Sequence, residues 1–289
     1  MLATIIFIHA TDQSWAQTDM DAAIAAHPRF PKLAEGQKRG DLVSFQSGDR
    51  MLRGFLYTPL GDGPFPAIIW NHGSEKLPGW QPELAAFYNR HGFVFFIPHR
   101  NGHGRSPGDY IMDRLERLRD WALDVDLFRA SVVEELEKDN QDVVAATEWL
   151  KKRPFVDPNR IVMSGVSFGG IQTLLAAEKG LGVAGFISFA PAAISWGNWH
   201  LRERLKYAVT NAKAPVFVLQ AQNDYSTGPA ETFEPLLQRK GPPNRAKIYP
   251  PFGKTKRHGH GAFATWNIGT EIWGNDVMSF IGQILNIKR

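Results

Sequence analysis

The chain has 289 residues, 43% of them hydrophobic, so it can bury a large core and is predicted to form a single α/β domain. Its 33 basic and 29 acidic residues leave a net charge of only +4, without the block of like charge that is typical of a nucleic-acid-binding arm. The absence of cysteine excludes disulfides, thiolate metal sites and a cysteine nucleophile. We therefore expect a small-molecule partner and no nucleic acid.

Residues 2–10 are apolar, and the Ser-Trp-Ala at 14–16 resembles the cleavage region of a secretory signal peptide. No Lys or Arg occurs before residue 29, however, whereas secretory signals begin with positive charge. A signal peptide over 1–16 would make the protein secreted or periplasmic, and the alternative is a cytoplasmic protein; both are open. Residues 17–40 are predicted to be a polar lead-in to a domain over 41–289. No stretch reaches the roughly 18 apolar residues of a membrane span.

Residues 41–46 and 51–57 are strand-like runs around a Ser-Gly-Asp turn, which predicts an antiparallel pair. Buried-type strands follow at 66–70 and 93–97, with a helix at 82–91 between them.

The next region, 113–149, has broken amphipathic periodicity with room for two or three helices, the last at 142–150. These helices either pack on the sheet or, over 110–134, form a small lid above the site. A turn is predicted at 157–159.

A strand at 161–163 runs into Gly-Val-Ser-Phe-Gly at 165–169, and good helix formers resume at 171–177. A Gly-Ser-Gly string alone is only a turn. In the order strand, turn, helix, the G-x-S-x-G spacing is typical of a nucleophile elbow that exposes the hydroxyl of Ser167.

The rest of the chain continues the alternation of apolar strands and helices, which predicts a mostly parallel sheet covered on both faces. The carboxyl ends of such strands share one edge, where ligands bind. The expected strands are at 185–189, 215–220 and 246–249, and the helices at 201–211, 230–239 and 275–287.

Loops after two of these strands carry the partners that a serine nucleophile needs, a base and a carboxylate that orients it. Asp224 follows one strand, and His258 and His260 lie in a predicted loop at 258–263. Ser167, Asp224 and His260 thus follow the chain order serine, acid, histidine. Asp224 as a mere helix cap is the alternative. A His-x-His pair can be half of a metal site, but no further ligand stands nearby, so no metal is expected. Only one of the two histidines can lie beside the elbow, and His260 is favoured over His258.

The negative charge of an acyl-transfer intermediate requires preorganised donors. One is expected from the backbone N–H of Phe168 at a helix N-terminus, and the second from the N–H of Ser74 after the hinge His72-Gly73. His72 is given no catalytic role. Trp196, Trp199 and Tyr225 either line a substrate pocket or pack in the core.

Together these motifs resemble the α/β-hydrolase superfamily, and most of all the dienelactone hydrolase family and prolyl-oligopeptidase-type catalytic domains. They are Asn-His-Gly-Ser at 71–74, the loop at 100–107, residues 157–161, the elbow at 165–170, Gln-Asn-Asp at 222–224 and Gly-His-Gly at 259–261. The resemblance implies an eight-stranded-type sheet, the triad Ser167–Asp224–His260, the oxyanion hole and an acyl-enzyme route without cofactor. Dienelactone hydrolases proper have cysteine in place of Ser167.

We therefore predict a serine hydrolase that cleaves carboxylic esters or lactones of small molecules. A peptidase or amidase of the prolyl-oligopeptidase type is the alternative within enzymes. A non-catalytic α/β-hydrolase fold that only binds ligands is the alternative from another class.

Overall fold

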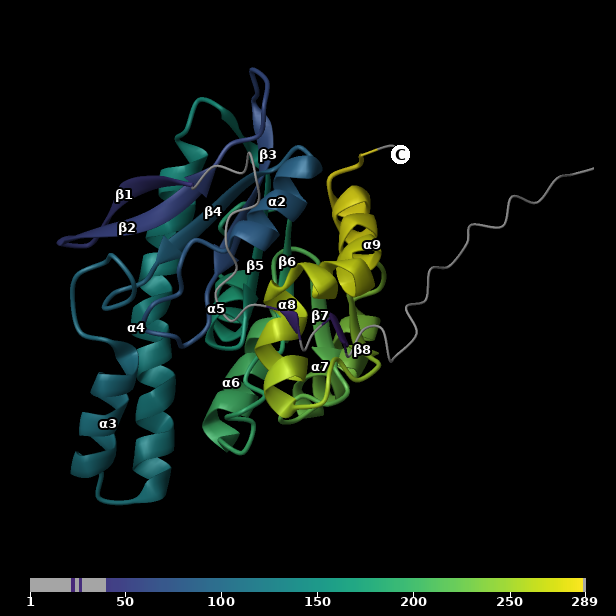
Figure 1. Ribbon diagram of the computed structural model, residues 1–289. Helices are drawn as coiled ribbons and strands as arrows, with labels where there is room; N and C mark the ends of the chain where they lie inside the picture. The colour runs from purple at the N-terminus through teal and green to yellow at the C-terminus, as the bar shows by residue number, and fades with distance from the viewer. Residues whose placement is uncertain (1–21, 24–25, 28–39, 288–289) are drawn as a thin grey trace, which may run out of the picture.

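The computed structural model describes residues 22–23, 26–27 and 40–287, and its centre is an eight-stranded sheet (Figure 1). The expected signal peptide at 1–16 and nearly all of the lead-in at 17–40 lie outside the described residues. Among the described helices, none is both long and apolar enough to cross a bilayer.

The sheet has the order β1-β2-β4-β3-β5-β6-β7-β8. β2 pairs antiparallel with β1 and β4, and all other neighbours are parallel, which confirms the predicted α/β-hydrolase fold. The strands are β1 (Asp41–Ser47), β2 (Arg50–Tyr57), β3 (Phe65–Asn71), β4 (Val94–His99), β5 (Val156–Val166), β6 (Gly185–Phe189), β7 (Val216–Ala221) and β8 (Arg245–Tyr249).

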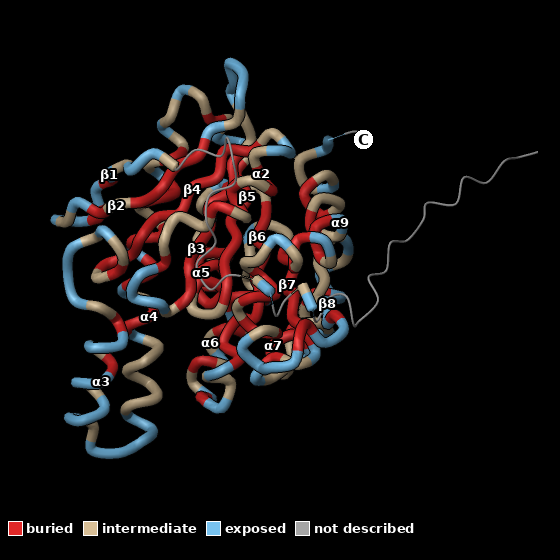
Figure 2. Tube along the Cα trace, viewed as in Figure 1, coloured by how far each residue is buried: buried red, intermediate tan, exposed pale blue. Residues whose placement is uncertain are grey.

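Helices cover both faces of this sheet, and the inner strands β3, β4, β6 and β7 are almost entirely buried, whereas the outer strands β1 and β8 are partly exposed (Figure 2). One apolar core lies beneath α4 to α7, and the other beneath α2 and α9. The helices are α2 (Pro82–Arg90), α3 (Ile111–Trp121), α4 (Val125–Lys151), α5 (Phe168–Ala177), α6 (Trp199–Thr210), α7 (Gly228–Arg239), α8 (Phe263–Thr265) and α9 (Asn267–Ile284).

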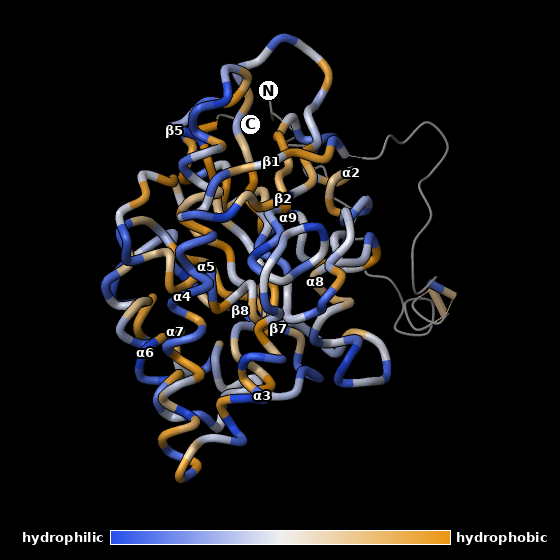
Figure 3. Tube along the Cα trace, turned by 90° about the vertical axis from the view of Figure 1, so that its left-hand side faces the viewer, coloured by the Kyte–Doolittle hydropathy of each residue, from blue (hydrophilic) through white to orange (hydrophobic). Residues whose placement is uncertain are grey.

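The predicted separate helix at 142–150 is wrong, because α4 is one continuous helix. Its sequence has no Gly or Pro, and the side chain of its N-cap Asp124 accepts a hydrogen bond from the N–H of Leu127 at 2.7 Å. The first turns of α4 and all of α3 project from the body as a hairpin (Figure 1). Apolar positions continue to its tip (Figure 3), where Trp121 and Leu123 are exposed.

Three further boundaries differ from the prediction. The turn expected at 157–159 is part of β5, where Asp157 accepts from the N–H of Asn159 and the register with β3 shifts. The expected loop at 258–263 is a wide π-helical turn, η1 (His258–Ala262), that leads into α8. α9 begins eight residues before its predicted start, because Gly269 and Gly274 do not break it. A methyl group on Gly269 would meet the carbonyl of Phe263, so this glycine permits close packing.

Candidate active site

Ser167 stands at the sharp turn between β5 and α5. Its φ of 58° and ψ of −117° are strained for a residue with a side chain, at a cost of about 1–3 kcal/mol. The turn persists because its surroundings fix it: the Ser167 N–H donates to Phe189 O at 3.0 Å. A methyl group on Gly165 would lie 2.5 Å from Gly169 O, and one on Gly169 would meet Asn71 O. The two glycines therefore allow strand and helix to approach closely enough to present the hydroxyl.

His260 joins Ser167 to Asp224. Its Nε2 lies 2.8 Å from Ser167 Oγ, and its Nδ1 lies 2.7 Å from Asp224 Oδ1. In the tautomer with hydrogen on Nδ1, the imidazole donates to the carboxylate and accepts from the hydroxyl. Asp224 also accepts from Gln220 Nε2 at 2.9 Å and from the N–H of Tyr225 at 2.6 Å. The buried carboxylate thus accepts hydrogen bonds from the histidine, from a side chain of β7 and from its own loop.

The geometry bears on the alternatives for Asp224 and His258. α7 begins at Gly228 after Thr227, and no side chain caps it, so Asp224 is not its cap. The ring of His258 packs against that of Trp266 at 5.8 Å between centroids, and the histidine that bonds Ser167 Oγ is His260.

The two expected oxyanion donors lie on either side of the nucleophile. Phe168 is the first residue of α5. The loop after β3 passes close to Ser167, since a methyl group on Gly73 would lie 3.7 Å from Ser167 Cβ. Within the described part of the chain, the N–H groups of Phe168 and Ser74 have no hydrogen-bond partner. Both donors are therefore available to a ligand.

Glu75, which follows Ser74, was not predicted as a site residue. Its carboxylate folds back over residues 72–76, the loop after β3 that we call the oxyanion loop. Its Oε2 would be 2.5 Å from a methyl group on Gly73. Burial of the carboxylate raises its pKa, and the charges of Arg100 and His260 partly oppose this effect. No motif in the sequence could have indicated Glu75, because its position depends on how the loop folds back.

The expected pocket aromatics have three different surroundings. Tyr225 lies edge-on to the ring of His260, with 5.3 Å between centroids, and is 42% exposed. The indole N–H of Trp199 donates to Asp126 Oδ1 of α4 at 2.8 Å. Trp196 packs edge-on against an aromatic ring of α7. Only Tyr225 contacts the Ser-His-Asp chain.

Behind the oxyanion loop lie three buried histidines, His72, His99 and His103. Burial, assisted by the Arg100 charge, lowers the pKa of His103 to about 3 and that of His72 well below its usual value. Burial lowers the pKa of His99 to about 4. The neutral ring of His99 has partners for both nitrogens, since Nδ1 accepts the N–H of Arg105 at 3.2 Å and Nε2 donates to Gly79 O at 3.0 Å.

These histidines predict a loss of stability in mild acid. The unfolded chain takes up their protons below pH 6.5, whereas the folded chain does so only near pH 4 and pH 3, so the free energy of unfolding falls as the pH is lowered. From pH 7 to pH 5 the expected loss is about 2 kcal/mol for each of His99 and His103. The free energy of unfolding is measured with urea at pH 7 and at pH 5. Between these pH values it should fall by about 2 kcal/mol less in His99→Gln than in the wild type. Equal losses in the two proteins would contradict the assignment.

Comparison with known proteins places this fold in a family. The sequence model of the prolyl oligopeptidase family matches residues 130–286, and that of the X-Pro dipeptidyl-peptidase (S15) family matches 47–205. Each match covers more than half of the chain. The polyketide transferase grgF of a Penicillium species is 26% identical over 224 residues, which are 71% of this chain and 67% of that protein.

Solved structures share the same fold. An acylaminoacyl peptidase of Pyrococcus horikoshii superposes with a TM-score of 0.63 at 18% identity, covering 86% of this chain but only 42% of the peptidase. Est1E of Butyrivibrio proteoclasticus, solved with ferulic acid, has a TM-score of 0.59 at 17% identity over 83% of this chain and 99% of Est1E. The chain is therefore a serine hydrolase of the α/β-hydrolase superfamily and belongs to the prolyl oligopeptidase family.

Proposed function

We propose that the protein hydrolyses carboxylic esters or lactones of small molecules through an acyl-enzyme on Ser167. The observation that carries the proposal is the unbroken chain of hydrogen bonds from Asp224 through His260 to Ser167. A serine hydroxyl is a weak nucleophile until a base removes its proton, and this chain supplies the base and the carboxylate that orients it.

In the proposed reaction, Ser167 Oγ attacks the ester carbonyl while its proton moves to His260 Nε2. Asp224 stabilises the imidazolium through Nδ1. The oxyanion accepts hydrogen bonds from the N–H groups of Phe168 and Ser74, and the N-terminus of α5 adds its dipole. His260 then protonates the leaving alcohol, and a water activated by the same imidazole releases the acid. No cofactor is required by these steps.

The rim of the site favours an uncharged, partly apolar substrate. Tyr225 beside His260 is 42% exposed. Exposed apolar side chains close to a polar catalytic centre are suited to bind the acyl or alcohol group of a small ester.

Cleavage of peptides or amides is the second candidate, because both matching family models are of peptidases. Matched substrates separate the two. We expect kcat/KM for p-nitrophenyl esters, from acetate to octanoate, to exceed that for the corresponding p-nitroanilides by at least about 10³-fold, since an amine leaves only when protonated well. A higher kcat/KM for the anilides, or for short peptides, would replace the esterase proposal. Binding of esters without turnover would support the non-catalytic alternative.

A further inference from the structure

The loop between β4 and α3 holds every carbonyl of the oxyanion loop. Five consecutive carbonyls, from His72 to Lys76, accept hydrogen bonds from residues 100–110. The donors are Arg100 Nη1 to His72 O at 2.9 Å, Arg100 Nη2 to Gly73 O at 2.7 Å, Tyr110 Oη to Ser74 O, His103 Nδ1 to Glu75 O at 3.0 Å, and Gly104 N to Lys76 O at 2.8 Å.

Arg100 acts on the peptide group between Gly73 and Ser74, whose N–H is the second proposed oxyanion donor. In a trans peptide the C=O and N–H point in opposite directions. When the guanidinium holds Gly73 O on the inner side, the N–H of Ser74 must point away from Arg100. His72 Nδ1 also donates to Gly73 O, at 2.9 Å, and so supports the same orientation. On its other side the loop lies against Ser167, since a methyl group on Gly73 would be 3.7 Å from Ser167 Cβ.

Arg100 is only 1% exposed, and burying a charged side chain is costly unless hydrogen bonds or opposite charges compensate it. Among the described residues, no carboxylate forms an ion pair with it within 4.0 Å. Its charge is balanced at longer range by Asp139, Glu75 and Asp142. Its two terminal nitrogens are thus free to bond the two backbone carbonyls rather than an acid.

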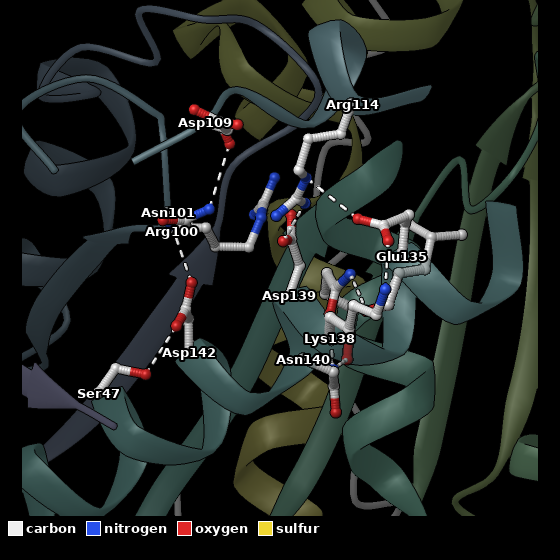
Figure 4. A network of polar contacts seen from close by, with 12 residues as sticks. Ser47, Arg100, Asn101, Asp109, Arg114, Glu135, Lys138, Asp139, Asn140 and Asp142 are labelled. Atoms are coloured by element: carbon white, nitrogen blue, oxygen red, sulfur yellow. Dashed lines mark hydrogen bonds and ion pairs between the residues drawn. The ribbon is translucent and has the colours of Figure 1, made fainter. Parts of the chain in front are cut away.

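Helix α4 anchors the loop that carries this arginine (Figure 4). Asp142 accepts from the N–H of Asn101 at 2.8 Å and from Ser47 Oγ at 2.6 Å, while Asp139 pairs with Arg114. Arg100 lies next to these contacts, and the polar residues of α4 fix the start of the loop relative to the sheet.

We infer that Arg100 is a positioning residue for the oxyanion hole, which aims the Ser74 N–H by holding the carbonyls of His72 and Gly73. The inference rests on the proposed hydrolysis through Ser167. It assigns a role to a residue that touches neither substrate nor nucleophile.

The test compares Arg100→Met and Arg100→Lys with Arg105→Met, a control that removes a cation from an exposed position of the same loop. Loss of an aligned oxyanion donor lowers kcat by roughly 10²-fold, so Arg100→Met should lose about that factor while KM changes less than about threefold. The affinity for a trifluoromethyl ketone analogue of the ester, whose adduct carries the oxyanion, should fall in parallel. Arg105→Met should retain wild-type values.

Lysine offers one ammonium in place of a two-pronged donor, so Arg100→Lys should lose about tenfold in kcat. If Arg100→Met does not fold, Arg100→Lys decides. Wild-type kcat and analogue affinity in the folded variants would overturn the inference, and so would a rise in KM with kcat unchanged. Ser167→Ala is measured in parallel: retained hydrolysis there would refute the proposed function, whereas an inactive Ser167→Ala with normal Arg100 variants refutes only the role of Arg100.

Discussion

Replacing Ser167 by alanine is expected to lower kcat for p-nitrophenyl esters by roughly 10⁵- to 10⁶-fold. The variant lacks the hydroxyl oxygen that lies 2.8 Å from His260 Nε2, so no acyl-enzyme can form on residue 167. What remains should be the small acceleration due to the oxyanion donors and to substrate binding. The measurement is the initial rate with p-nitrophenyl butyrate at saturating concentration, on protein purified away from host esterases.

The variant should keep the fold, because alanine retains the Cβ and the backbone N–H bond to Phe189 O. Thermal unfolding should therefore give nearly the wild-type melting temperature. Activity of Ser167→Ala within tenfold of the wild type would mean that the strained turn serves packing and that the reaction occurs elsewhere.

The second large effect is expected at His260, and the chain provides its own control two residues away. His260→Ala should lose about as much as Ser167→Ala, because the nucleophile and its base act as a unit. His258→Ala should stay within about threefold of the wild type, since the ring of His258 packs on Trp266 and the histidine that bonds Ser167 Oγ is His260. The two variants remove the same side chain from the same helical turn, η1.

Kinetics of the double variant add a further check on this pair. Ser167→Ala/His260→Ala should be no slower than either single variant, because removing the second member of a broken unit costs nothing more. Loss of activity in His258→Ala together with normal activity in His260→Ala would reverse the assignment of the base.

Local patterns were sufficient to predict most of the fold. Buried parallel strands are continuous apolar runs, so β3, β4, β6 and β7 were found within one or two residues. β5 was predicted only over 161–163 and extends further at both ends, over Val156–Val166. The polar residues in the middle of α4 suggested a boundary that does not exist. They are polar because of tertiary contacts: Asp142 bonds Ser47 of β1, and Asn140 Nδ2 donates to Gln172 O of α5 at 2.9 Å. A sequence alone does not distinguish such buried contacts from a helix end.

Part of the candidate site could likewise be predicted from the sequence, and part could not. Ser167 was predicted from spacing, and Asp224 and His260 from chain order, since each follows a strand whose carboxyl end reaches the same edge. Arg100 and Glu75 could not be identified so. Their position depends on the approach of the β4–α3 loop to the β3 loop, and residues far apart in sequence leave no local pattern of such an approach.

Covalent capture of the nucleophile tests the central claim most directly. The wild-type protein is treated with a fluorophosphonate, and the modified residue is located by peptide mass spectrometry, with Ser167→Ala and His260→Ala in parallel. The account predicts one label per chain on Ser167, no label in Ser167→Ala, and labelling slowed by several orders of magnitude in His260→Ala. A label on another residue, or equal labelling of wild type and Ser167→Ala, would contradict it.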